Sequence, residues 1–123
     1  MAGAFKTPQS LATPSSEKPA RYDLAVVIVT GSVTVRPEQL AEALTLSLAH
    51  VRRSRREPGC RSHAVHQGVE DPNRLFFFEQ WADAASLAMH FRVPESGAFV
   101  AALRRMAGSP PELSVYTAEA VST

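Results

Sequence analysis

The hydrophobic positions of the chain follow two periods, and each change of period marks a predicted element. Residues 22–30 form a short β-branched apolar run before Gly31, which predicts a strand that is apolar on both faces. From Pro37 onward, apolar side chains recur at helical spacing and predict a helix, which Pro58-Gly59 ends. The first half of the chain therefore reads as a strand followed by a helix.

The second half begins with two strand-like runs at residues 60–67 and 74–81. The segment 68–73 between them is polar and rich in turn formers, so we predict an antiparallel hairpin. Asp83 then has the position of an N-cap for a second helix, which Pro94 should kink or break. A last strand follows, with one face formed by Leu113, Val115 and Thr117.

The predicted order β-α-β-β-α-β is typical of the ferredoxin-like α+β fold, a four-stranded antiparallel sheet with two helices on one face. Two helices can cover one sheet face only, yet the first strand is apolar on both. The aromatic strand also has Phe76 and Phe78 on one side and Leu75 and Phe77 on the other. We therefore expect a homodimer that buries the uncovered face, with Val27 or Ile28 directed outward.

Length and composition limit the alternatives. A chain of 123 residues accommodates one domain, which we place at 21–123 after a flexible arm at 1–20. A net charge of +1 gives no electrostatic argument for nucleic acid or a membrane surface, and no apolar run approaches the ~20 residues of a membrane span. Cys60 is the only cysteine, which excludes an internal disulfide. We expect a cytoplasmic protein.

Several short motifs occur in a characteristic order: Glu57-Pro58-Gly59-Cys60, Asp71-Pro72, Glu79-x-Trp81, and then His90, Pro94 and Phe99 in the interrupted helix. This ordered set resembles the antibiotic-biosynthesis-monooxygenase family. The resemblance implies a dimeric α+β barrel with a pocket between sheet and helices. It also implies oxidation of quinols, anthrones or related polycyclic phenols by O₂ without a metal or a flavin, so no cofactor is expected.

The chain departs from the family pattern at three positions. The family often has His at the position of Glu95, an aromatic residue at Ser96 and Tyr at His63. These differences alter the rim of the implied pocket. His63 therefore becomes a candidate pocket residue, as do Phe77 and Phe99, which would form pocket walls.

His90 and Trp81 are the candidate catalytic residues. A neutral His90 imidazole could accept the proton of a phenolic substrate; the alternative is a structural histidine bonded to a backbone carbonyl. Trp81 could stack on a flat ring or donate Nε1–H to a substrate oxygen; the alternative is a place in the core. Glu79 shares a strand face with Trp81 and is therefore a further candidate pocket residue. If buried, it needs a histidine or arginine partner; the alternative is a solvated charge at the strand end.

A metal site is not expected. His63 and His66 are an odd number of residues apart, so they lie on opposite faces of one strand and cannot bind the same ion. No Cys, Asp or Glu stands near them at metal-ligand spacing.

The sequence thus predicts a cofactor-independent monooxygenase that oxidises a small aromatic, quinol-like compound with O₂. A second hypothesis is a dimeric module that binds a small hydrophobic ligand without turnover, motivated by Glu95 and Ser96. A third and weaker one is a haem-degrading relative, which would use an Asn on the first strand. Residues 22–30 contain no Asn.

Overall fold

Four strands and four helical segments make up the described part of the chain, residues 25–123 of a computed structural model. The predicted arm at 1–20 and the start of the first strand lie outside these residues. In chain order the elements are β1 (Ala25–Thr34), the 3-10 turn η1 (Pro37–Gln39), α2 (Leu40–Ser54), β2 (Cys60–Gln67), β3 (Arg74–Trp81), α3 (Ala84–Arg92), α4 (Pro94–Met106) and β4 (Glu112–Glu119). None of these helices is long and apolar enough to cross a membrane.

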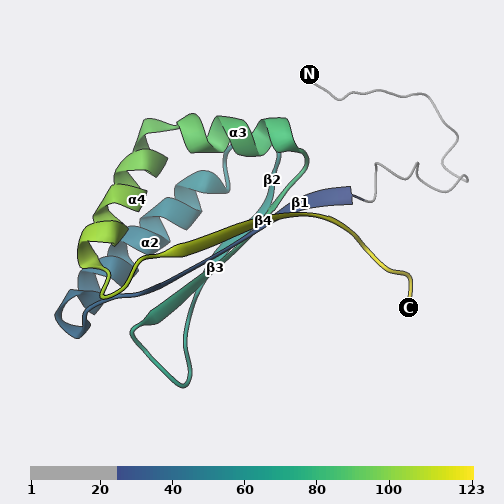
Figure 1. The fold of residues 1–123 in the computed structure, drawn as a ribbon. Coiled ribbons are helices and arrows are strands. Elements are labelled where there is room, and N and C mark those ends of the chain that lie inside the picture. The colour runs from purple at the N-terminus through teal and green to yellow at the C-terminus, as the bar shows by residue number, and fades with distance from the viewer. Residues whose placement is uncertain (1–24) are drawn as a thin grey trace, which may run out of the picture.

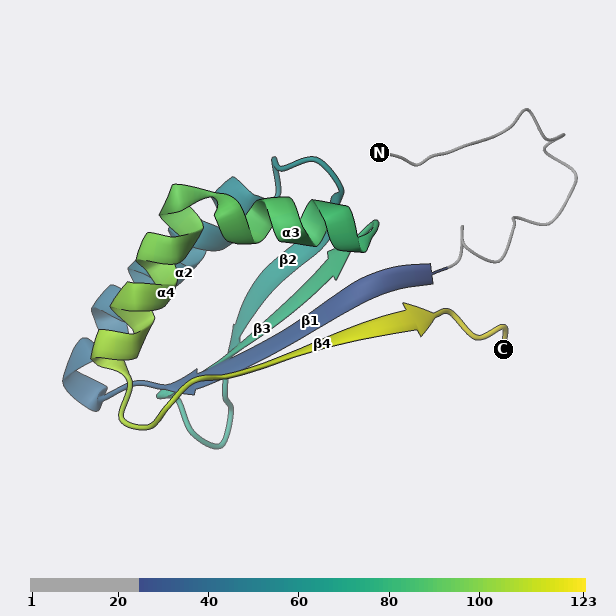
Figure 2. The same cartoon turned by 45° about the horizontal axis from the view of Figure 1, so that its top comes forward.

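The strands form one antiparallel sheet in the order β2-β3-β1-β4, and the helices lie on one side of it (Figure 1; Figure 2). The predicted ferredoxin-like α+β fold is therefore confirmed. The hairpin strands also have the predicted bounds, 60–67 and 74–81.

β1 differs from the prediction at its end. It continues through Gly31 to Thr34, because Gly31 stays extended and pairs with Phe77 on one side and Leu113 on the other. A glycine ends a strand only where the backbone must turn, and no turn occurs here.

The register of β1 and β3 fixes which side chains face the helices. Val27 lies opposite Trp81 and Val29 opposite Glu79, and all four are buried beneath the helices. Val27 is thus excluded as an outward position, because strand side chains alternate and its neighbour Ile28 takes the other face. Two buried apolar clusters result, one around Leu75 and the other around Val27 and Trp81.

The predicted interruption of the second helix is real. The Asp83 side chain accepts a hydrogen bond of 2.8 Å from the backbone N–H of Ser86 and caps α3. α3 ends at Arg92, Val93 is extended, and Pro94 opens α4. The chain changes direction at this break, so that α3 and α4 run at an angle to each other (Figure 1).

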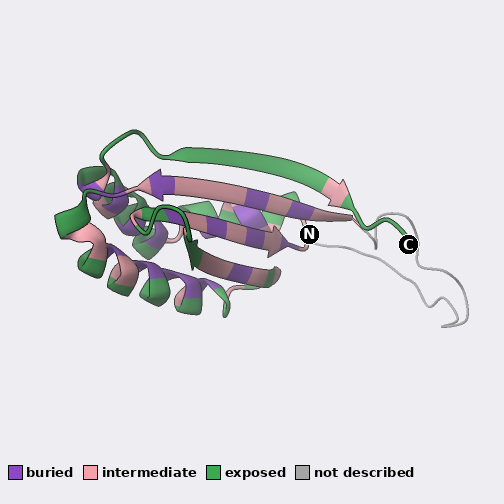
Figure 3. Ribbon diagram, turned by 90° about the horizontal axis from the view of Figure 1, so that it is seen from below, coloured by how far each residue is buried: buried purple, intermediate pink, exposed green. Residues whose placement is uncertain are grey.

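β4 lies at the edge of the sheet, beyond the cover of the helices. Its residues are exposed along almost the whole strand, whereas β1 and β3 alternate between buried and half-buried positions (Figure 3). Leu113, Val115 and Tyr116 are 57%, 49% and 53% exposed. This chain alone therefore leaves an apolar edge strand and one sheet face uncovered.

Gly59, in the turn before β2, should not tolerate a side chain. Its φ of 82° is left-handed, and a Cβ there would collide with the Ser86 side chain. We expect Gly59→Ala to lower the free energy of unfolding by about 2 kcal/mol. Gly97→Ala in α4 is the matched control, because a Cβ there meets nothing within 4 Å and should raise stability by about 0.5 kcal/mol. Urea unfolding of both variants measures the difference; equal stabilities would contradict this assignment.

Candidate functional site

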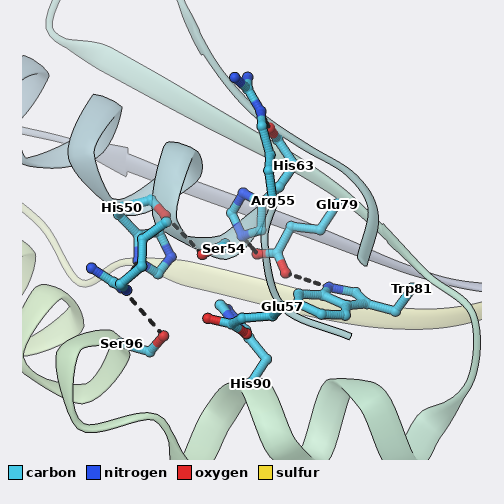
Figure 4. A network of polar contacts seen from close by, with 10 residues as sticks. His50, Ser54, Arg55, Glu57, His63, Glu79, Trp81, His90 and Ser96 are labelled. Carbon is cyan, nitrogen blue, oxygen red and sulfur yellow. Dashed lines mark hydrogen bonds and ion pairs between the residues drawn. The ribbon is translucent and has the colours of Figure 1, made fainter. Parts of the chain in front are cut away.

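Three histidines and a glutamate from four different elements meet between the two apolar clusters: His50 of α2, His63 of β2, Glu79 of β3 and His90 of α3 (Figure 4). All four are buried. The ring centroids of His50 and His63 are 5.1 Å apart, and each lies 5.4 Å from that of His90. So dense a group of titratable side chains is uncommon in a core and marks a candidate functional site.

Local structure explains why these side chains converge. His63 and Glu79 are cross-strand partners on the helix-facing side of the hairpin. His90 lies on the buried side of α3 with Leu87, and His50 lies on the buried side of α2 with Ser47 and Ser54. As predicted, His63 and His66 lie on opposite faces of their strand: His63 is buried and His66 is exposed.

Glu57, in the turn before β2, holds the ring of His90. The His90 Nδ1 atom lies 2.8 Å from Oε1 of Glu57, and both side chains are largely buried. Because a carboxylate only accepts hydrogen bonds, Nδ1 carries the proton and donates it. A neutral His90 therefore presents an unprotonated Nε2. Its partner is a carboxylate rather than the backbone carbonyl considered from the sequence.

Glu79 is held by Trp81, whose Nε1–H donates to Oε1 over 2.9 Å. Burial raises the pKa of the Glu79 carboxyl above its usual value, and the Trp81 hydrogen bond offsets part of that rise. His63 Nε2 lies 3.4 Å from Oε2 of Glu79. Burial, then the neighbouring His90 and arginines, lowers the pKa of His63 to about 3. His63 is therefore neutral at pH 7, and its contact with Glu79 is not an ion pair.

His50 is also neutral. Burial lowers its pKa to about 3, with further contributions from His63, His90 and Arg53. Arg53 donates to Nδ1 over 2.8 Å, which leaves the proton of the neutral ring on Nε2. The His50 ring stacks on Phe99 with centroids 4.1 Å apart and an interplanar angle of 12°.

A cavity of about 180 Å³ opens beside this group. Its polar lining includes His50, Glu79, His90 and Ser96, and its other walls are mainly apolar: Val33, Phe77, Phe91, Phe99, Val100, Leu103 and Leu113. One end of the cavity thus offers polar side chains, including His50 and Glu79, whose pKa values are shifted by burial. The rest of the cavity suits a small flat hydrophobic molecule.

The cavity contains four of the residues singled out from the sequence, Phe77, Glu79, His90 and Phe99. Trp81 and His63 do not line it, which differs from the prediction. Trp81 is fully covered and donates its N–H to Glu79, and both rings stand against His90, with centroids 4.6 and 5.4 Å away. Trp81 and His63 thus lie behind the cavity wall and pack against His90, which is part of it.

Sequence reasoning missed His50 and the role of Glu57. A signal for His50 existed, because it lies near Ser47 and Ser54 at helical spacing on a predicted buried stripe. A titratable residue in that position is a candidate in the same way as His90. Glu57 gave no comparable signal, because its partner is 33 residues away.

A model of the family described as antibiotic biosynthesis monooxygenase matches residues 26–102. An uncharacterised protein from the cyanobacterium Synechocystis, sll1783, is 32% identical over 90 residues, which are 73% of this chain and 61% of that protein. The chain thus spans less than two thirds of that relative.

Solved structures of similar fold include a conserved protein from Methanosarcina mazei, with a TM-score of 0.73 and 25% identity over 77% of this chain and 94% of that one. Rv0793 from Mycobacterium tuberculosis also has a TM-score of 0.73, with 21% identity over 80% and 99% of the two chains. The second likeness concerns the fold alone.

Proposed function

Because the chain belongs to the antibiotic biosynthesis monooxygenase family, we propose that it oxidises a small aromatic, quinol-like compound with O₂. The observation that carries the proposal is His90: a buried imidazole in the cavity wall, fixed through Nδ1 by the Glu57 carboxylate. That arrangement leaves Nε2 as a proton acceptor beside a space for an aromatic ring.

Proton removal is the step that this site would promote. An anthrone loses a proton from its CH₂ carbon, and a hydroquinone loses one from oxygen. The resulting electron-rich anion can pass one electron to O₂, and recombination of an anthrone radical with superoxide forms a peroxide at carbon. Loss of water then leaves a new carbonyl, so that one oxygen atom enters the product and the other enters water. His90 would take the first proton and return it to the peroxide anion. It would then take the remaining proton from that carbon as the O–O bond breaks, and return this proton to the departing hydroxide as water.

The remaining cavity residues would bind and orient the ring. Phe77 and Phe99, whose rings are 5.8 Å apart in a T-shaped arrangement, form an apolar wall on which a flat substrate can pack. His50 offers a neutral N–H that can stabilise the negative oxygen of the substrate anion. Exclusion of water from the cavity would strengthen the hydrogen bond from His50 to the substrate oxygen, because electrostatic interactions are stronger at low dielectric constant.

Oxygen uptake with a panel of hydroquinones and anthrones, in metal-free buffer, tests the proposal. We expect at least one compound to give protein-dependent O₂ consumption with formation of the quinone or carbonyl product. Rates no higher than those without protein, across the panel, would contradict it.

A dimeric binding module without turnover is the second candidate, and Ser96 is the observation that favours it. Ser96 is 4% exposed and lines the cavity at a position where the family often has an aromatic residue, so the wall differs from that expectation. Thermal stabilisation by an aromatic ligand, with no product formed, would support this function, because ligand that binds only the native state raises its stability.

The proposal includes a homodimer formed through the sheet face that the helices leave open. Ile28, Phe76 and Phe78 belong to that face and are only half-buried in one chain, and Tyr116 of β4 is exposed beside them. Interfaces of stable dimers bury about 800 Å² per partner and are rich in aromatic residues. The aromatic and aliphatic side chains of this sheet face favour such an interface.

Ile28→Asp should dissociate the dimer, because it places a charge in the middle of this face. Light scattering at micromolar concentration should give twice 13.3 kDa for the wild type and a smaller, less stable species for the variant. Ala41→Asp, exposed in the first turn of α2, adds the same charge away from the sheet and should leave the mass unchanged. A well-folded 13.3 kDa wild-type species would contradict the dimer.

A further inference from the structure

We propose that His50, His63 and His90 form a binding site for a divalent transition-metal ion, with Zn²⁺ as the reference ion. The site shares His90 with the proposed oxidation but does not depend on it, and follows from the positions and the hydrogen bonding of the three imidazoles.

The first argument is geometric. One ring nitrogen from each histidine lies within 4.8 Å of those of the other two, and all three side chains are buried. Tetrahedral zinc with bonds of about 2.1 Å needs nitrogens roughly 3.4 Å apart. Binding of an ion would therefore require the three rings to turn so that nitrogens now within 4.8 Å of one another reach that separation.

The second argument is the state of His63. Its ring is almost completely buried, yet Nδ1 has no hydrogen-bond partner and Nε2 has only the 3.4 Å contact with Glu79 Oε2, which lacks hydrogen-bond geometry. Buried polar atoms are almost always paired, and an unpaired one costs about 1–3 kcal/mol. A metal ion bound to one of these nitrogens would remove that deficit.

The surroundings of the three rings also suit an ion. Glu57 accepts the Nδ1 proton of His90, the arrangement that orients metal-binding histidines and makes their other nitrogen a better ligand. Glu79 Oε2 lies 3.4 Å from His63 Nε2 and supplies a carboxylate beside the rings. Two carboxylates would thus oppose the charge of the ion, and two guanidinium groups lie nearby: that of Arg53, and that of Arg55, which donates to the backbone carbonyl of His63.

Arg53 must move when the ion binds. It now donates to Nδ1 of His50 over 2.8 Å, and metal ligation by His50 either occupies or protonates that nitrogen. Ser96 Oγ lies 3.5 Å from the same guanidinium nitrogen and remains as an acceptor. Arg53 would therefore keep a hydrogen-bond acceptor, Ser96 in place of His50, when the ion binds.

The ligand set indicates which ions the site would take. Imidazole nitrogens favour Zn²⁺, Co²⁺, Ni²⁺ or Cu²⁺ over Mg²⁺ and Ca²⁺, which prefer oxygen ligands. His50 and His90 line the cavity, so a further coordination position would be open toward it. An ion there would occupy the nitrogen of His90 that the proposed oxidation uses as a base, and it should therefore inhibit that reaction.

Equilibrium dialysis with Zn²⁺ and absorption spectroscopy with Co²⁺ test the site. We expect the wild type to bind one ion per chain, to show the intense visible bands of four-coordinate Co²⁺, and to bind no Mg²⁺ under the same conditions. His63→Gln should weaken Zn²⁺ binding by more than about 100-fold, and Glu57→Gln by roughly 10-fold or more.

His66→Ala is the matched control, because it removes an exposed histidine from the same strand and should bind the ion as the wild type does. His50→Gln serves in place of His63→Gln if circular dichroism shows that the latter does not fold. Absence of stoichiometric binding by the wild type, unchanged binding by both folded cluster variants, or loss of binding in His66→Ala would each overturn the proposal.

Discussion

Replacing His90 with glutamine should slow the oxidation by at least about 100-fold while leaving the fold intact, because general-base catalysis contributes about 10²–10⁴-fold to rate. Glutamine has a similar length and can still donate to the Glu57 carboxylate, but its amide cannot accept the substrate proton. The loss should appear equally in kcat and kcat/KM, since the interaction of His90 with the transferring proton is made only in the transition state.

Two further variants distinguish the base from the scaffold around it. Glu57→Gln keeps His90 in place but removes the negative charge that would stabilise the imidazolium formed when His90 takes the substrate proton, so we expect a smaller loss of about tenfold. His66→Gln, on the exposed side of β2, should retain the wild-type rate. Wild-type turnover in His90→Gln would rule out His90 as the base.

Acidification should destabilise the metal-free protein strongly. His50 and His63 have pKa values of about 3 in the folded protein, whereas histidine titrates near pH 6.5 in an unfolded chain. Between these values the unfolded state binds more protons than the native state, so the free energy of unfolding falls as pH falls. The raised pKa of Glu79 acts in the opposite direction and offsets part of the loss at lower pH.

Each of these two histidines should lower the free energy of unfolding by about 2 kcal/mol between pH 7 and roughly pH 5, since one pH unit is worth about 1.4 kcal/mol per proton. Urea unfolding across this range, with a chelator present, measures the loss. His50→Gln removes one of the two groups and should show about half the dependence. Equal stability at both ends of the range would contradict the assignment of two buried neutral histidines.

The fold was largely accessible from the sequence because its signals are local. The polar segment 68–73 fixes both ends of the hairpin, and Asp83 and Pro94 fix the limits of α3. Gly31 misled the prediction because a glycine is compatible with a turn and with an extended strand alike, and only pairing with both neighbouring strands decides between them.

The candidate site was accessible only in part. His90, Glu79 and Phe99 were identified from the ordered motifs that resemble the family, and all three are buried in the structure. Their partners depend on how the helices cross the sheet, which periodicity does not encode. The contact of Glu57 with His90 and the meeting of His50 with His63 arise from that packing.

The contacts of Trp81 in the structure also differ from those that the sequence predicted. An aromatic residue at the end of β3 fits a pocket wall and a core position equally well from the sequence. Its place opposite Val27, fully buried and bonded to Glu79, puts it beneath the wall rather than on its surface.

The central claim is that His90 removes a proton from an aromatic ligand bound in the cavity. The most direct test is the absorption spectrum of a chromophoric phenol, para-nitrophenol, bound to metal-free protein without oxygen at a pH where the free phenol is mostly protonated. We predict the phenolate spectrum on binding to the wild type, and the neutral phenol spectrum on binding to His90→Gln. Binding of neutral phenol to both proteins, or of phenolate to both, would contradict the claim.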